Sequence, residues 1–423
     1  MSRRSPLLTR LLATGPRVDG RLVLLAAVAV YLAVITIGRT LLNVDLWPWL
    51  GVPSGPSLFF DARNVTAAAE CRRLGLDPLV DNPCDPRGRA MFYPRVWLLL
   101  RFLGLDQSHT DLFGVLLGLG LLGVLWFLVG RVTVGAGVVL TLAVCSPSVM
   151  FAVERANMDV ALLSLVGVAA LGWRRGTGPD ALVSPILVLL AAVAKLYPVF
   201  GLAAYLVSGS RKAALAAVGC GVVFVVYAIA TLGGIAVVVR TAIQGQHHAF
   251  GARILLSRAY QLVAGQPLGA GSALTQLLAL LALGVAAMAV FAAFRRRSTP
   301  APQLEPVTST MLAWWLGTVI FVGSFAISNS FDYRLVFLLL TLPQLLRWAC
   351  GQEAQQRLAS ATLVSVILLL WVGALSMPLR LADELVTWAT VGLFVAMSAR
   401  LLPPVRLLGA RRGAPAGRPD GGQ

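Results

Sequence analysis

Long apolar runs separated by short polar turns dominate the chain. The first covers residues 22–39, and later ones cover about 111–130, 133–150, 158–173, 212–232, 272–294, 309–327, 333–349, 359–376 and 385–402. About 20 apolar residues in a helix cross the ~30 Å hydrocarbon core of a bilayer. The runs are continuous rather than alternating, which excludes a β-barrel. We therefore expect an all-α, polytopic transmembrane helical bundle with about ten crossings.

The apolar run 184–206 differs from the others because Lys195 and Pro198 interrupt it. If this run crossed the membrane, Arg211 and Lys212 would lie on the side opposite to the other basic clusters, against the positive-inside rule. Discontinuous helices are tolerated where they are buried in protein or line a cavity. The pattern therefore predicts a re-entrant pair of half-helices, with Lys195 near its apex.

Composition and charge indicate how the bundle is oriented. The 423 residues are 58% hydrophobic and only 13% charged, with a net charge of +17. Short basic clusters alternate with the apolar runs, which is the positive-inside pattern rather than a nucleic-acid surface. We expect a basic cytoplasmic N-terminus at 1–21, a transmembrane domain at 22–402 and a disordered basic cytoplasmic tail at 403–423. The long polar segment 40–110 then lies outside.

The outer segment 40–110 contains elements of its own. Residues 62–74 have the composition of a short helix, and 93–104 that of a short helix lying at the membrane surface. Cys71 and Cys84 lie in the same polar loop. Outside the cell these two cysteines can form a disulfide bond, and the alternative is a pair of free thiols.

Polar residues that carry chemistry gather at the predicted outer face. They are Asp61, Arg63, Asp77, Asp81, Asp85, Arg89 and Arg95 in the first loop, Glu154, Arg155, Asn157 and Asp159 in the second, His247 and His248 in the third, and Asn329, Asp332, Tyr333 and Arg334 in the fourth. Ionisable residues at membrane depth are costly and usually mark a functional site. The site is therefore expected at this face.

Asp61 and the second loop each allow two interpretations. Asp61 follows Phe59 and Phe60, and its carboxylate suits either a general base or a helix cap. Asn157 and Asp159 begin a predicted span and cannot both face solvent, so at least one is expected to point into the bundle. The alternative for this loop is an interfacial salt bridge, with Asp159 compensating the helix dipole.

The basic residues leave similar alternatives. Lys195 lies far from both ends of its apolar run, and a buried ammonium needs an anion, either a phosphate head group or an internal carboxylate. Arg334 can pair with Asp332 or hold a phosphate through two hydrogen bonds. Adjacent histidines such as His247 and His248 rarely point the same way, so a metal site is not expected.

The order of these motifs resembles that of bacterial membrane proteins close to glycosyltransferase family 87, which have the GT-C architecture. The resemblance rests on Asp61-Ala62-Arg63-Asn64, Gly75-Leu76-Asp77-Pro78, Asn82-Pro83-Cys84-Asp85-Pro86, Tyr93-Pro94-Arg95, Glu154-Arg155-Ala156-Asn157-Met158-Asp159, Lys195-Leu196-Tyr197-Pro198 and Asp332-Tyr333-Arg334. The chain departs from the pattern at Ala156, where that group has glycine, and at Phe92, where it has asparagine.

The resemblance implies a fold and a reaction. GT-C enzymes transfer a sugar, with inversion, from a polyprenyl-phosphate donor at the outer leaflet. By position Asp61 would be the general base, and Lys195, Arg334 and Arg155 would hold the donor phosphate. The other residues expected to bind substrate are Arg63, Asp85, Tyr93, Arg95, Glu154, Asn157, Asp159, Tyr197, His247, His248, Asp332 and Tyr333.

The resemblance also suggests the sugar, the partners and the location of the reaction. It includes mycobacterial α-mannosyltransferases that act on phosphatidylinositol mannosides, so mannose is the first expectation for the sugar. The expected partners are membrane lipids, the polyprenyl-phosphate sugar and a glycolipid or glycan acceptor, without nucleic acid, cofactor or divalent metal. The expected location is a bacterial plasma membrane, with both termini cytoplasmic and the active site facing outside.

Two other functions fit the same residues. A transporter or flippase of a lipid-linked sugar also needs a buried lysine and broken helices, although it does not need a long, ordered first loop. A non-catalytic partner in cell-envelope assembly would tolerate substitution of both Asp61 and Lys195.

Overall fold

The protein is described by a computed structural model that is mainly helical. The described residues are 19–402 except 175, 242–247, 256–276, 278–279, 286, 289–290, 293–306, 328–329, 352–354 and 374–379. The α-helices are α2 (Gly20–Thr40), α3 (Phe60–Arg73), α4 (Thr110–Val129), α5 (Val134–Val144), α6 (Pro147–Glu154), α7 (Met158–Leu171), α8 (Asp180–Ala194), α9 (Ala203–Leu206), α10 (Arg211–Ala230), α11 (Leu232–Thr241), α14 (Ser309–Ile327), α15 (Leu342–Cys350), α16 (Gln356–Val372) and α17 (Arg380–Leu401).

Shorter elements connect these helices. The 3-10 helices are η1 (Pro48–Leu50), η2 (Arg95–Leu103), η3 (Gln107–His109), η4 (Tyr197–Leu202) and η5 (Asp332–Thr341). Strands β1 (Ala249–Phe250) and β2 (Ser330–Phe331) pair antiparallel, with Ala249 opposite Phe331. The pairing brings the segment after α11 against the start of η5.

Within the described part of the chain, five helical segments are long and apolar enough to cross a membrane: Gly20–Thr40, Gln107–Val129, Arg211–Ala230, Ser309–Ile327 and Ala382–Leu401. A sixth is added if the bent pair α5 and α6 counts as one span. The chain is therefore a multi-pass membrane protein. The expected ten crossings are not reached among the described residues. Helices such as α7 have fewer than the 18 residues required of a span, and most of the predicted run 272–294 lies outside the described residues.

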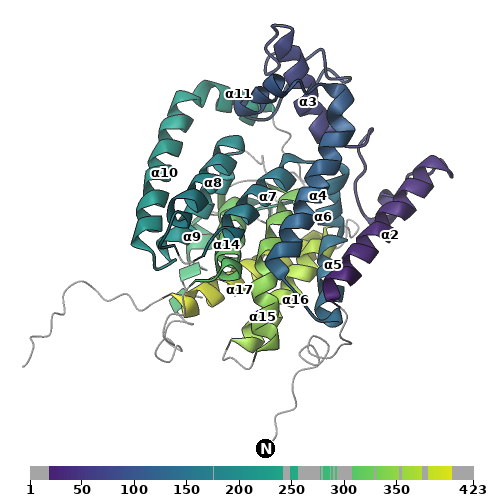
Figure 1. Cartoon of the computed structure of the whole chain (residues 1–423). Coiled ribbons are helices and arrows are strands. Elements are labelled where there is room, and N and C mark those ends of the chain that lie inside the picture. Colours follow the sequence, from purple (N-terminus) through teal and green to yellow (C-terminus); the bar gives the residue numbers. More distant parts are fainter. Residues whose placement is uncertain are drawn as a thin grey trace, which may run out of the picture.

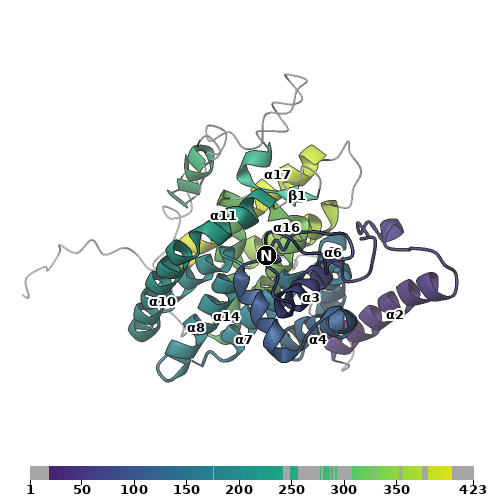
Figure 2. The same ribbon diagram turned by 90° about the horizontal axis from the view of Figure 1, so that it is seen from above.

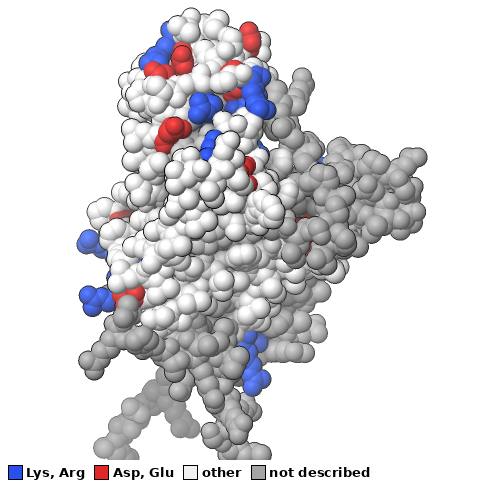
Figure 3. Space-filling view, turned by 90° about the vertical axis from the view of Figure 1, so that its right-hand side faces the viewer, with Lys and Arg blue, Asp and Glu red and all other residues white. Residues whose placement is uncertain are grey.

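The molecule has a polar end and an apolar body. Figure 1 shows α3 at one end, close to α11, and the end of α15 toward the other. In the view from above, α2 lies at the edge of the bundle (Figure 2). On the face drawn in Figure 3, charged side chains gather at the end that holds α3, and few interrupt the broad band below it. Such a band suits a lipid environment.

The predicted span 133–150 is broken, because the helix ends after α5 and continues as α6 at an angle of 57°. The Ser146 hydroxyl caps α6 by accepting a hydrogen bond from the Val149 amide, and Pro147 occupies the first turn. Proline lacks an amide hydrogen and suits only the first turn of a helix. The bend directs the C-terminal end of α6 toward the loop that begins α3.

The segment 184–206 folds back on itself as a helical hairpin, the shape expected of a re-entrant pair, although its first arm begins earlier, at Asp180. α8 ends at Ala194, and the chain turns at Lys195 into η4 and α9. Near the open end of this hairpin, the Ser184 hydroxyl lies 2.6 Å from the Tyr205 hydroxyl. At that end the Ser210 hydroxyl also donates to the Gly176 carbonyl. Both arms therefore start and finish on the same side of the bundle.

The first loop contains both predicted helices, α3 and η2, and a disulfide bond joins Cys71 to Cys84. Of the two interpretations of Asp61, the helix cap is wrong: Phe59 occupies the cap position of α3, and Asp61 lies within the first turn. The predicted outer loop after α10 instead forms helix α11, where Val238 packs against the cluster that includes Met91. These contacts fix the loop at the end of the bundle.

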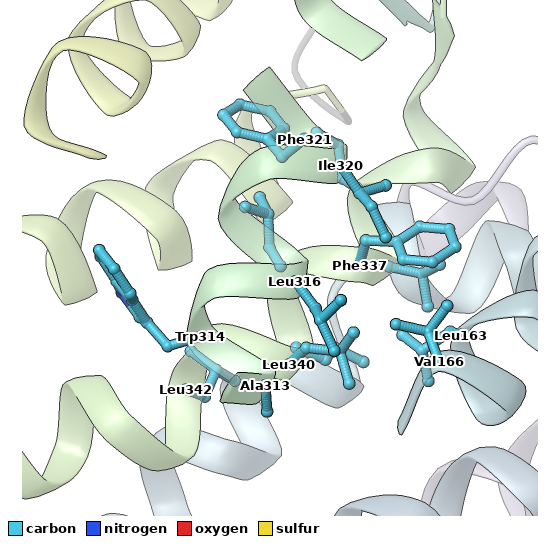
Figure 4. Close-up of a cluster of buried hydrophobic side chains, with 14 of the residues drawn as sticks. Leu163, Val166, Ala313, Trp314, Leu316, Ile320, Phe321, Phe337, Leu340 and Leu342 are labelled. Carbon is cyan, nitrogen blue, oxygen red and sulfur yellow. The ribbon is translucent and has the colours of Figure 1, made fainter. Parts of the chain in front are cut away.

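The apolar core joins α7, α14 and η5. Figure 4 shows side chains of Leu163, Leu316 and Phe337 from these three elements near one another, and all three are fully buried. The backbones of α14 and η5 approach so closely at Gly317 that a Cβ there would lie 2.8 Å from the Phe337 carbonyl oxygen. The core thus holds η5, which carries Tyr333 and Arg334, firmly against the bundle.

Candidate active site

The N-terminus of α3 docks on the C-terminal end of α6, and this contact positions Asp61. The Phe59 amide donates to the Glu154 carbonyl at 2.9 Å, and the Asp61 amide donates to the Arg155 carbonyl at 3.0 Å. The first amides of a helix and the last carbonyls of another have no partners within their own helices. Joined end to end, the two helices satisfy each other's free groups and hold the Asp61 backbone in place.

The Asp61 carboxylate is nearly buried, with 4% of the residue exposed. Its Oδ2 accepts a hydrogen bond of 2.6 Å from Asn157 Nδ2. Its Oδ1 lies 3.6 Å from Arg155 Nη1. The amide donor and the guanidinium therefore contact the two carboxylate oxygens separately.

A second carboxylate lies on the other side of Asn157. Lys195 Nζ donates to Asn157 Oδ1 at 3.2 Å and to Asp159 Oδ1 at 2.5 Å. Asn157 and Asp159 are both fully buried, which confirms that this loop points into the bundle. Of the two anions considered for Lys195, the structure shows the internal carboxylate.

Arg334 and Tyr197 complete the cluster around Asp159. Arg334 Nε lies 3.9 Å from Asp159 Oδ2, and Nη1 donates to the Ser330 hydroxyl at 2.8 Å. The Arg334 guanidinium lies 4.7 Å from the centre of the Tyr197 ring. Three cations, Lys195, Arg334 and Arg155, therefore face two carboxylates, Asp61 and Asp159.

Aromatic rings flank these cations. Lys195 Nζ lies 5.2 Å from the centre of the Tyr93 ring and 5.3 Å from that of Tyr333. The Arg155 guanidinium lies 4.8 Å from the Phe151 ring, which in turn packs against Tyr333 at 5.5 Å. Cations interact favourably with such ring faces, most strongly where water is excluded.

The model of glycosyltransferase family 87 matches residues 98–316, more than half of the chain. The chain belongs to glycosyltransferase family 87. The matched range contains Arg155, Asn157, Asp159 and Lys195 and begins after Asp61.

Two further comparisons add little to the family assignment. The structure of ArnT from Cupriavidus metallidurans in the apo state is similar at 16% sequence identity, over 88% of this chain and 77% of that chain, with a TM-score of 0.35. At that score the likeness supports no conclusion about fold or function. No curated protein matches the sequence.

The turn at residue 156 has a backbone conformation that favours glycine. Ala156 adopts a φ of +45°, in the left-handed region that favours glycine. The chain turns sharply here between α6 and α7, which places Arg155 and Asn157 on either side of Asp61. This family 87 glycosyltransferase thus keeps the turn with alanine, at a conformational cost of about 1 kcal/mol.

Three of the expected substrate-binding residues form contacts away from the Asp61–Lys195 cluster. Arg63 lies 3.7 Å from Asp111, Arg95 pairs with Asp77 at 2.7 Å, and Asp85 pairs with Arg89 at 2.8 Å. The hydrogen bond from Arg95 lowers the pKa of Asp77. These contacts shape the loop around the site.

Asp85 is the buried centre of the first loop. Burial alone would raise the pKa of its carboxyl, but hydrogen bonds from Arg89, the Arg87 amide and Asn64 outweigh burial and lower it. Arg89 also donates to the Phe60 carbonyl at 2.9 Å. Asp85 therefore helps to fix the residue that precedes Asp61.

Glu154 and Asp332 also hold loops in place. Glu154 Oε1 accepts from the Gly55 amide at 2.8 Å. Asp332 donates its amide to the His248 carbonyl at 2.9 Å, and its Oδ2 lies 3.9 Å from His248 Nδ1. His247 lies outside the described residues. No group of three or more His, Cys, Asp or Glu side chains that could hold a metal ion occurs in the described part of the chain.

The sequence analysis missed Trp97, which ties the first loop to the helix break. Its Nε1 donates to the Ala194 carbonyl at 2.9 Å, at the end of α8 next to Lys195. Trp97 follows the Tyr93-Pro94-Arg95 motif closely, and an indole in a surface helix signals a polar partner. The identity of that partner, 97 residues away, has no local signature.

Proposed function

We propose that this membrane glycosyltransferase transfers a sugar, with mannose as the first expectation, from a polyprenyl-phosphate donor to a lipid or glycan acceptor. The reaction takes place at the extracytoplasmic face of the plasma membrane. The observation that carries the proposal is the continuous contact from Asp61 through Asn157 to Lys195. It places a carboxylate that can accept a proton beside a cluster of cations that can hold a phosphate.

In the proposed reaction, Asp61 accepts the proton of the acceptor hydroxyl as that oxygen attacks the anomeric carbon. The bond between this carbon and the donor phosphate oxygen breaks, and polyprenyl phosphate leaves with the bonding electrons. Attack from the face opposite to the leaving group inverts the configuration. A positioned general base contributes about 10²- to 10⁴-fold to such a step.

The cations suit the leaving group. The Lys195 ammonium has three N–H groups, of which two donate to Asn157 and Asp159. The third can donate to a phosphate oxygen. The side chains of Arg155 and Arg334 retain 23% and 18% exposure, so both can reach a ligand that enters beside them. Charge developing on the phosphate is stabilised by donors fixed in advance.

The disulfide bond supports the proposed orientation. Disulfides persist in oxidising compartments and are rare in the cytosol. Cys71 and Cys84 lie in the loop that also carries Asp61, so the active site is proposed to face outside, with both termini in the cytoplasm. We expect the reaction to need no cofactor, with the lipid-linked sugar as co-substrate.

The test compares wild type with Asp61→Asn in a strain that lacks the gene, with envelope lipids and glycans analysed by mass spectrometry. The matched control is Asp111→Asn, which changes a carboxylate whose side chain is 73% exposed near the same helix. The proposal predicts that one sugar is missing only with Asp61→Asn. A normal profile with Asp61→Asn would remove this residue as the base and favour transport or a structural role.

A further inference from the structure

Asn157 is a single side chain that touches both halves of the proposed site. Its Nδ2 donates to Asp61 Oδ2 at 2.6 Å and to the Tyr93 hydroxyl at 3.3 Å. Its Oδ1 accepts from Lys195 Nζ at 3.2 Å. Asn157 has no exposed surface, so these contacts are not shared with bulk water. One amide therefore connects the base on α3 with the ammonium at the end of α8.

The charges on both sides fix the orientation of this amide. In the reverse orientation, the Asn157 oxygen would face the Asp61 carboxylate and the NH2 group would face the Lys195 ammonium. Both contacts would then be repulsive. The Asp159 amide also donates to Oδ1 at 3.0 Å, which holds the side chain at the start of α7. The amide is thus held in one orientation by three groups.

We propose that Asn157 is a positioning residue that sets the geometry between the general base and the cation that holds the donor phosphate. This inference rests on the proposed function. The amide NH2 fixes the position of Asp61 Oδ2 through the 2.6 Å hydrogen bond. The amide oxygen orients Lys195, so that its third N–H points to the donor. Loss of the amide changes both partners at once.

A purely structural role is the alternative, because Asn157 also caps α7. Asparagine and aspartate cap helices about equally well, so Asn157→Asp keeps the cap. It replaces the NH2 group with an oxygen that lies 2.6 Å from Asp61 Oδ2. Two carboxyl groups this close share a proton, and the apparent pKa of the base rises. The two roles therefore predict different pH dependences for the same variant.

Other charged and titratable groups face this pair from each neighbouring element. They are Glu154 on α6, Arg155 between α6 and α7, Asp159 on α7, Lys195 after α8, Tyr197 on η4, Tyr333 and Arg334 on η5, and Tyr93 before η2. Wild type and variant share all of them. A difference between their pH profiles therefore reports the new carboxyl group.

The experiment measures transfer by the purified full-length protein in lipid nanodiscs. Polyprenyl-phosphate mannose is the donor probe, and envelope lipids from the deletion strain supply the acceptor. For Asn157→Asp we expect the acid limb of kcat/KM to move up by about one pH unit or more, which is a tenfold or larger loss below the limb. Activity recovers in part at high pH.

The matched control is Asn64→Asp. Asn64 is also fully buried and donates from Nδ2 to a carboxylate, Asp85 Oδ2, at 3.1 Å. We expect the acid limb of this variant to stay at its wild-type position. The comparison separates the effect of a new buried carboxyl group in general from its effect beside Asp61.

An unchanged acid limb in folded Asn157→Asp would overturn the inference, whereas absence of transfer by wild type would instead overturn the proposed function. If Asn157→Asp does not yield folded protein by size-exclusion chromatography, Asn157→Ser replaces it, since serine also caps helices. A higher donor KM together with a lower kcat would then support the positioning role. An unchanged donor KM would overturn it.

Discussion

Replacing Lys195 with methionine removes a buried ammonium and keeps an unbranched side chain. Asp159, which has no exposed surface, then loses its 2.5 Å contact with Nζ. Arg334 remains beside it, but its Nε lies 3.9 Å from Asp159 Oδ2. In the variant, the buried Asp159 carboxylate keeps only Arg334 as a neighbouring cation, and at a longer distance. In the wild type it has two neighbouring cations, Lys195 and Arg334.

The expected loss follows from the burial of this pair. Removing one partner of a buried ion pair costs about 3–5 kcal/mol, because the other charge stays in a medium of low polarity. Because Arg334 remains beside Asp159, we expect Lys195→Met to lower the free energy of unfolding by about 3 kcal/mol, the lower end of this range. Adding Asp159→Asn removes the stranded charge, so the double variant should regain most of the lost free energy of unfolding. It should not regain sugar transfer, because the ammonium group of Lys195 that is proposed to bind the donor phosphate is still missing.

The free energy of unfolding can be measured by titrating mixed micelles with a denaturing detergent. Lys212→Met is the matched control, since Lys212 is the only other lysine and lies exposed at the start of α10. It should unfold like wild type. If Lys195→Met is as stable as wild type, or if the double variant is less stable than either single variant, the ion pair does not have the role assigned to it.

Two further predictions concern the first loop. Replacing Cys71 with serine opens a loop of sequence separation 13 and should lower the free energy of unfolding by about 3 kcal/mol, measured by thermal unfolding with the reduced wild type as control; equal stability of oxidised and reduced wild type would contradict this. The lowered pKa of Asp85 means that its contribution to stability is present above the usual value of about 3.9 and is lost as pH falls through the lower folded value. Asp85→Asn should therefore lower the free energy of unfolding at neutral pH and make that free energy decrease less as the pH falls. If it decreases as steeply in the variant as in wild type, Asp85 does not have this role.

Much of the bundle could be predicted from the apolar runs. α2, α4, α10 and α14 begin and end within a few residues of the predicted spans, because continuous apolar sequence is a direct requirement of the hydrocarbon core. The hairpin around Lys195 followed from charge, since a full crossing would have placed Arg211 on the wrong side. The positive-inside rule thus predicted a turn that local helix propensity does not indicate.

The bend between α5 and α6 was missed although a signal was present. Ser146 followed by Pro147 is a helix cap followed by a first-turn proline, placed within one apolar run. Hydropathy averaged over that run hides the signal. Capping residues inside an apolar run therefore indicate that a span is broken.

The internal partners of the site could not be predicted from local sequence. Asp61 meets Asn157 across 96 residues, and Lys195 meets Asp159 across 36. Residue chemistry predicted that each buried charge needs a partner. For Lys195 it did not decide between a phosphate and a carboxylate as that partner. Only the packing of α3, α7 and α8 shows that a carboxylate already lies within hydrogen-bond distance.

The most direct test of the central claim uses purified wild type and Asp61→Asn, each supplied with isotopically labelled polyprenyl-phosphate mannose and envelope lipids from the deletion strain. Mass spectrometry follows the labelled sugar. The predicted result is a labelled product of inverted anomeric configuration with wild type and with Asp111→Asn, and none with Asp61→Asn, although all three proteins are folded. Equal product formation by Asp61→Asn would contradict the claim that this carboxylate is the base.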